Sequence, residues 1–197
     1  MSLRENSIYW YLAVMAVASW ILVNLSGFDE VSRGLPPAHS PDFFSKSYAK
    51  WEMNDIGVLK NKLLADKMTH YSDDRTTYLD RPEFFSFSGE PTAPTPDNRP
   101  PWVIAAESGL LSADGKDLLL NGKVTIARAG ATRLRPMQIN TSNLTVKPET
   151  SYAETDDWAE LVSSSNRTTG TGMKLIFKEP VRLELLSHVQ GKYETKQ

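Results

Sequence analysis

The residues of this chain that could do chemistry are three histidines and two pairs of adjacent aspartates. His39, His70 and His188 are scattered, with no pair at i and i+4 and no His-Glu-x-x-His motif. The chain has no cysteine, so it has no thiol nucleophile and no sulfur ligand for zinc. The sequence therefore predicts neither a metal site nor a bound cofactor.

The aspartate pairs are Asp73-Asp74 and Asp156-Asp157. Adjacent side chains on a strand point to opposite faces, so turns and exposed charges explain these pairs better than acid–base catalysis does. Residues 169–173 read Thr-Gly-Thr-Gly-Met, but the third glycine of a dinucleotide-binding motif is missing. A tight turn or a bulge explains them better. We therefore expect no catalytic residue, and a binding protein rather than an enzyme.

Charge excludes a further class of partner. The chain has 22 Lys and Arg against 24 Asp and Glu, a net charge of −2. Nothing in this balance resembles the basic surface of a nucleic-acid-binding protein. Without cysteine there are no disulfides and no lipidated cysteine, so the domain must be stabilised by burial alone.

Residues 8–25 form an uncharged and mostly apolar run of 18 residues, with Trp10 and Trp20 toward its ends. As a helix it would rise about 27 Å, close to the roughly 30 Å hydrocarbon core of a bilayer. The alternative is a cleaved signal peptide, for which residues 16–18, Ala-Val-Ala, resemble a cleavage site. The apolar run continues past this site, which favours a retained transmembrane helix over residues 8–25.

Charges around this run indicate its orientation. Arg4 precedes it, whereas Asp29 and Glu30 follow it. Because positive charge stays on the cytoplasmic side, residues 1–7 should be cytoplasmic and the large domain should lie across the membrane. In a bacterial inner membrane that side is the periplasm. We expect a linker over residues 26–47 and one domain over residues 48–197.

The pattern of the large domain is typical of β-strands, with apolar and polar residues alternating. The apolar pairs are Trp51/Met53, Val124/Ile126, Leu144/Val146, Leu175/Phe177 and Leu183/Leu185. Helical spacing is weak, over Val58–Met68 alone. Turn signals such as Asn121-Gly122 separate the strands, and the proline-rich residues 89–101 predict an exposed loop. A weak repeat of about 41 residues suggests stacked hairpins, leaving a solenoid, an open roll and a barrel-like stack as alternatives.

Several motifs, in this order, resemble one known family. They are Tyr48-x-x-Trp51-x-Met53, Leu64-Ala65-Asp66, Leu118-x-Leu120-x-Gly122-x-Val124 and Gly170-x-Gly172-Met173-x-Leu175. Together with the N-terminal apolar run they resemble the LptC family, the single-pass inner-membrane components of the lipopolysaccharide transport bridge. The resemblance implies a mainly β fold, a twisted antiparallel β-jelly roll of the OstA/LptA-like type.

The resemblance also implies partners and a non-enzymatic role. Lipopolysaccharide would come from an ABC transporter made of LptF, LptG and LptB, and would pass to the periplasmic protein LptA. The N-terminal edge of the jelly roll would join the transporter and its C-terminal edge would join LptA. The alternative is a membrane-anchored structural protein with a closed core, whose domain only docks partners.

The candidate site residues follow from the alternation and from the resemblance. Inward apolar residues that would contact acyl chains are Met53, Leu120, Val124, Ile126, Leu144, Leu175 and Leu183. Residues expected to shape or form the C-terminal docking edge are Gly172, which matches a sensitive glycine of the family, Leu185 and Tyr193.

Overall fold

The computed structural model describes residues 5–25, 39–87, 99–131, 134–164 and 166–193, and the chain divides into two units at residue 38. The first unit contains one helix, α1 (Glu5–Leu25). Its described side chains cover residues 9–24, about 24 Å of helix, against a hydrocarbon core of roughly 30 Å. A search of the described residues finds no helix long and apolar enough to cross a membrane. The helix predicted over residues 8–25 is confirmed as a helix, but the predicted span is not.

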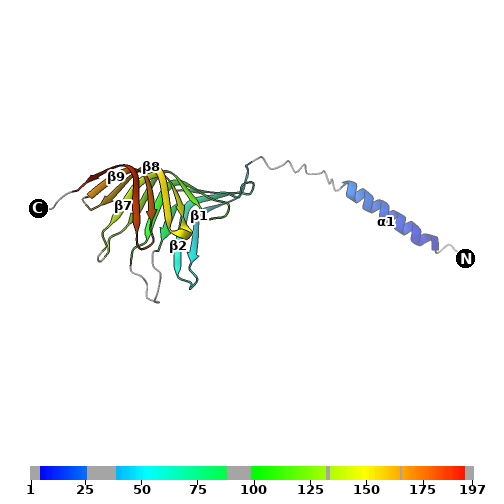
Figure 1. Ribbon diagram of the computed structural model, residues 1–197. Coiled ribbons are helices and arrows are strands. Elements are labelled where there is room, and N and C mark those ends of the chain that lie inside the picture. The colour runs from blue at the N-terminus through cyan, green and yellow to red at the C-terminus, as the bar shows by residue number, and fades with distance from the viewer. Residues whose placement is uncertain (1–4, 26–38, 88–98, 132–133, 165, 194–197) are drawn as a thin grey trace. The chain divides into compact units, whose positions relative to one another are not determined.

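The second unit is one ten-stranded antiparallel sheet, seen as a strongly curved sheet in Figure 1. Its elements are β1 (Pro41–Met53), β2 (Leu59–Tyr71), β3 (Thr77–Asp80), β4 (Glu83–Ser86), β5 (Trp102–Leu111), β6 (Leu118–Arg128), β7 (Met137–Lys147), a 3-10 turn η1 (Pro148–Thr150), β8 (Tyr152–Ser163), β9 (Asn166–Ile176) and β10 (Arg182–Lys192). Neighbours in sequence are neighbours in the sheet, except that β3 and β4 together occupy one position between β2 and β5. The mainly β prediction is confirmed.

The sequence left a solenoid, an open roll and a barrel-like stack as alternatives, and the structure is an open roll. Within the described residues β1 and β10 are the two ends of the sheet order. We call the second unit the β-roll.

Two local predictions need correction, and a third falls mostly outside the described residues. β1 begins at Pro41, so the predicted linker over residues 26–47 includes strand; residues 26–38 lie outside the described residues. The weakly helical stretch Val58–Met68 lies almost wholly in β2, where pairing on both sides outweighs local spacing. Of the proline-rich segment 89–101, residues 89–98 are outside the described part, and residues 99–101 lead into β5.

A line of irregular residues crosses the sheet, and we call this line the corner. The backbone φ is positive at Ser47 in β1, Arg81 between β3 and β4, Gly122 in β6, Asn143 in β7, Gly172 in β9 and His188 in β10. Pairing registers shift near the same line from β5 through to β10. An extra residue in one strand bends that strand, and aligned bulges make the corner of a folded sheet.

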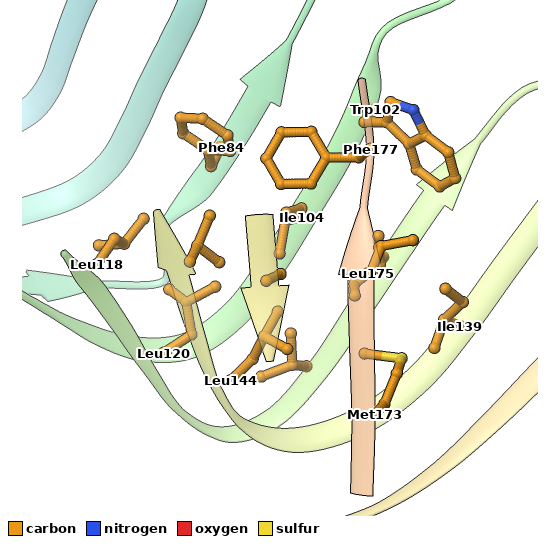
Figure 2. Close-up of a cluster of buried hydrophobic side chains, with 14 of the residues drawn as sticks. Phe84, Trp102, Ile104, Leu118, Leu120, Ile139, Leu144, Met173, Leu175 and Phe177 are labelled. Carbon is orange, nitrogen blue, oxygen red and sulfur yellow. The ribbon is translucent and has the colours of Figure 1, made fainter. Parts of the chain in front are cut away.

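The corner divides the long strands between two layers. Layer 1 contains β4, residues 102–106 of β5 and residues 123–128 of β6; layer 2 contains β3, residues 108–111 of β5 and residues 118–121 of β6. The inner faces pack together: the ring of Phe84 in layer 1 meets that of Phe177, which follows β9, with centroids 6.4 Å apart (Figure 2). The core therefore lies between the two layers.

Candidate functional site

Strand β6 supplies the centre of the inner face. Leu120, Val124 and Ile126 are at most 1% exposed, whereas Lys123 is exposed and Thr125 is half-buried. The predicted alternation is therefore correct for this strand. Contact of these residues with acyl chains stays a prediction.

The Asn121-Gly122 pair, predicted as a turn, lies inside β6 instead. Gly122 has φ of 75° and stands at the corner. A positive φ, which glycine adopts without steric cost, serves a bend within a strand as well as a hairpin turn. The sequence signal was real, but its structural meaning was different.

Two further candidates lie on the same inner face, and a third packs at its margin. Leu144 from β7 and Leu175 from β9 are at most 1% exposed. Leu183 from β10 is half-buried and packs against the core cluster. Figure 2 shows Leu120, Leu144 and Leu175 directed into one cluster from different strands. The sequence thus predicted most of an inner face that the fold assembles.

Met53 does not belong to this face. It ends β1 with 54% of its surface exposed, and Trp51 is equally exposed. Glu52 pairs with the buried Asn61, so the core-facing positions in this part of β1 are the even ones. The register then shifts between Glu52 and Met53, at the edge of the sheet. The inward assignment of Met53 was wrong because alternation gives the period of a strand but not which face is inner, and here Trp51 and Met53 both lie on the outer face.

Between the layers, away from the corner, lies a cavity of about 220 Å³ that sequence reasoning missed. Its apolar lining comes from Leu63 and Phe84 in layer 1 and from Leu111 and Leu118 in layer 2. At its edge the side-chain oxygen of Asn61 is buried without a hydrogen-bond partner. These residues come from four strands, so only folding brings them together.

The rim of layer 1 holds a charged group inside the roll. Arg128 ends β6 with 9% of its surface exposed, and among the described residues it is the only charged side chain that is buried. Its Nη1 lies 3.4 Å from Oε1 of Glu179, and its guanidinium carbon lies 4.6 Å from the ring centroid of Trp102. Arg99 Nη1 lies 3.8 Å from the same carboxylate oxygen. The even-numbered inward positions Val124 and Ile126 continue to Arg128, a signal that could have found it.

The C-terminal candidates lie at the last two strands. Gly172 has φ of 73°, and a Cβ added there would approach Leu186 of β10 to 2.9 Å. Leu185 is half-buried and packs against the core, whereas Tyr193 is 70% exposed just after β10. At this part of the corner the extra residue lies in β8, and Gly172 stands opposite it with a positive φ and a close neighbour in β10. The docking roles of all three residues remain predictions.

One surface group combines metal-ligand residue types that the sequence separated by 34 positions. Nδ1 of His39 lies 3.1 Å from Asp73 and 3.9 Å from Asp74, and all three side chains are exposed. The imidazole also stacks on Tyr71 at 4.1 Å, and Asp74 accepts a hydrogen bond from Thr76. The Thr76 hydrogen bonds are the main reason that the pKa of Asp74 is lowered. This group has a structural explanation. Its ion pair and its ring stack hold the start of the β-roll against the turn after β2.

Two tyrosines at the margin of the core have raised pKa values. Tyr48 packs partly against the core, and burial raises the pKa of its phenol. Burial, with a hydrogen bond to Glu154, raises the pKa of Tyr152 to about 12. Both phenols are neutral at physiological pH. The two phenols therefore add no charge at the margin of the core, and among the described residues the buried charged side chain is Arg128.

Comparison with known proteins assigns the family. The model of a family described as lipopolysaccharide-assembly, LptC-related, matches residues 11–194. The chain belongs to the LptC family. Relatives include the lipopolysaccharide export system protein LptC of Escherichia coli K12, which is 23% identical over 188 residues, covering 94% of this chain and 93% of that protein. LptC of Shigella flexneri matches with the same identity and coverage.

A solved structure supports the fold of this LptC-family chain. LptH, the LptA-homologous periplasmic component of the lipopolysaccharide transport device of Pseudomonas aeruginosa, superposes with a TM-score of 0.52 at 7% identity. The match covers 68% of this chain and 95% of LptH. The OstA/LptA-like architecture expected from the sequence is therefore confirmed at the level of fold.

Proposed function

We propose that this chain is a non-enzymatic component of lipopolysaccharide transport that holds acyl chains between the two layers of its β-roll. The observation that carries the proposal is the apolar inner face centred on β6, in a chain of the LptC family. Each methylene removed from water contributes about 0.8 kcal/mol, so the inner face can bind lipid without any catalytic group.

The two edges of the sheet would set the direction in which the β-roll passes lipid. Edge strands carry unpaired backbone groups that can add a strand from another chain. β1 would join an inner-membrane ABC transporter formed by LptF, LptG and LptB, and β10 would join the periplasmic bridge protein LptA. The chain would accept lipopolysaccharide at the first edge and pass it on at the second.

The N-terminal helix would retain the chain at the inner membrane, with residues 1–7 cytoplasmic and the β-roll periplasmic. Its small residues Ala13, Ala16 and Ser19 would allow close contact with helices of the transporter. The test is fractionation followed by N-terminal sequencing of the mature protein. Membrane recovery with an intact N-terminus is expected, and a start at Ser19 or later would overturn retention.

Site-specific photo-crosslinking tests lipid binding directly. Photo-reactive residues at Val124 and Ile126 should capture lipopolysaccharide, whereas the same residues at Lys123 and Thr125 on the opposite face should not. Equal labelling of both sets would mean that the inner face does not bind lipid.

A second candidate function is that of a docking protein whose core stays closed. The observation that favours it is the burial of the candidate residues, which already fill the space between the layers. Lipid entry would require the layers to separate, and Phe84 and Phe177 mark their contact. A Phe84→Cys, Phe177→Cys double variant suits the test because the chain has no native cysteine.

Joining the two thiols with a short, reducible thiol crosslinker should block lipopolysaccharide export, and reduction should restore it. Each single variant treated with the same crosslinker is the control. Export that continues with the layers locked together would favour the docking protein.

A further inference from the structure

We propose that Trp102 and Arg128 form an anion-binding site at the rim of layer 1, which takes a phosphate group of the transported lipid. The proposal rests on the proposed function for the source of the phosphate. Its evidence is a pair of buried nitrogen donors that have no acceptor.

Both side chains are buried, and each has a polar atom without a partner. The indole Nε1 of Trp102 and the Nε of Arg128 have no hydrogen-bond partner. Trp102 has no exposed surface, and Arg128 is 9% exposed. Leaving a buried donor unpaired costs about 1–3 kcal/mol, more for a charged group, and such groups are rare in folded proteins. Two of them in side chains that touch each other indicate a place for an acceptor.

The described residues place one carboxylate beside these donors. Glu179 is the carboxylate that faces them, and one of its oxygens lies within 4 Å of both Arg99 and Arg128. At 3.4 and 3.8 Å, these contacts are longer than the roughly 2.7–2.9 Å of a good charge-assisted hydrogen bond. The Arg128 guanidinium is positively charged, and its buried Nε–H has no acceptor among the described residues. An anion is therefore the complementary ligand.

The donors fit a phosphate, the anionic group that a transported lipopolysaccharide would bring to this site. A guanidinium presents its N–H groups as a planar fork, which matches two oxygens of a phosphate. The indole N–H can donate to a third oxygen of the same group. In the lipid-free protein Glu179 offers one oxygen to this site, so it acts as an internal carboxylate that phosphate would displace.

A neighbouring groove gives access for an amphipathic ligand. It has a volume of about 550 Å³, and Arg128 is the charged residue among those that line it. Its walls include the apolar side chains of Val103, Met137 and Val162. A phosphorylated lipid could therefore place its phosphate at Arg128 with apolar surface beside it, an arrangement that free phosphate does not use.

The competing explanation is a structural clamp in which Arg128 and Glu179 only join the two layers. The two explanations predict different results for the variant Glu179→Gln. A clamp would weaken, with no gain in ligand binding. An anion site would lose its internal competitor and bind phosphate more tightly.

The experiment measures binding of lipopolysaccharide, of the same lipopolysaccharide after enzymatic dephosphorylation, and of inorganic phosphate to the full chain in detergent. Affinity is read by titration, and the site is read from the Trp102 indole N–H resonance among those of the five tryptophans, identified by its loss in Trp102→Phe. We expect the phosphorylated lipid to bind about tenfold tighter than the dephosphorylated one, the effect of one charge-assisted hydrogen bond. It should also shift this resonance.

Single variants test which residues give the preference for phosphorylated lipid. Arg128→Lys, which keeps the charge without the fork, and Trp102→Phe should each reduce the preference for phosphorylated lipid, and Glu179→Gln should increase it. Arg167→Gln, which breaks the ion pair of an exposed arginine with Glu160, is the matched control and should change nothing.

Equal binding of the two lipids with an unshifted resonance would overturn the anion site and leave the proposed function intact. A shift produced equally well by inorganic phosphate, with no added affinity for the lipid, would overturn the lipid assignment. Failure of the unaltered chain to bind either lipid would count against the proposed function itself.

Discussion

Strands β6 and β1 belong to the same sheet but have very different surroundings. β6 lies in its middle, and every second residue from Leu118 to Arg128, except Gly122, is buried. β1 lies at its edge, and none of its 13 residues is buried. Phe44, Trp51 and Met53 are each more than half exposed.

The difference shows that alternation in sequence does not measure burial. Both strands carry apolar residues at alternate positions, but β6 has a neighbour on each side and the opposite layer above it. β1 has one neighbour, and its backbone φ is positive at Ser47. Apolar residues that an edge leaves exposed are the type of surface that another chain can cover. The centre of the sheet would hold lipid, and its edges would hold partners.

Removal of β10 is the most severe test of this division. Truncation after Glu179 should abolish pull-down of LptA while binding to the transporter through β1 is retained. Leu183 and Leu185 pack against the core, so the truncated protein should also lose stability, as measured by thermal unfolding. If LptA is still recovered at normal levels, β10 is not the docking edge.

Truncating a side chain should cost several kcal/mol more stability at the centre of the sheet than at its edge. Leu120→Ala leaves a cavity in the core and should lower the free energy of unfolding by about 2–5 kcal/mol. Met53→Ala, at an exposed position, should change it by less than about 0.5 kcal/mol. Urea denaturation of both variants measures the difference, and equal losses would contradict the contrast between β6 and β1.

Gly172 lies in β9, next to the edge strand β10. Its substitution separates two causes of strain, the positive φ and the close approach of a side chain. Gly172→Ala should lower stability by about 1–3 kcal/mol, because it combines a positive φ with the close approach of Leu186. Gly57→Ala has a similar φ of 78° but nothing within 4 Å, so it reports the backbone cost alone. The larger variant Gly172→Arg should remain folded and at the membrane but support export poorly. Equal losses in the two alanine variants would mean that Leu186 adapts without cost.

The smallest effect is expected at the corner, where hydrogen bonds from Ser142 and Asn143 lower the pKa of Asp157. A pKa lower in the folded than in the unfolded state contributes stability above the unfolded value, about 3.9, that is lost as pH falls through the folded value. Asp157→Asn should therefore be less stable than the unaltered chain at neutral pH, and the gap should close below about pH 3.9. Asp156→Asn, one residue away and exposed, is the control; a gap that persists in acid would mean that ionisation of Asp157 is not the cause.

The sequence by itself determined the class of the domain and much of its centre. Alternation at Val124 and Ile126, at Leu144 and at Leu175 predicted inner positions correctly, because a strand has a fixed period of two. The glycines before Met173 predicted a tight turn or a bulge, and Gly172 has a positive φ opposite a bulge in β8.

Only the tertiary structure decided which face each outer strand presents and which residues meet across the layers. β1 keeps one register with β2 from Phe43 to Glu52 and turns Trp51 outward, so Trp51 and Met53 are exposed despite their alternation. Trp102, Arg128 and Glu179 come from separate elements, and no local pattern relates them. The physical reason is that local sequence fixes the period of a strand, whereas bends and layer packing arise from contacts between strands far apart in the chain.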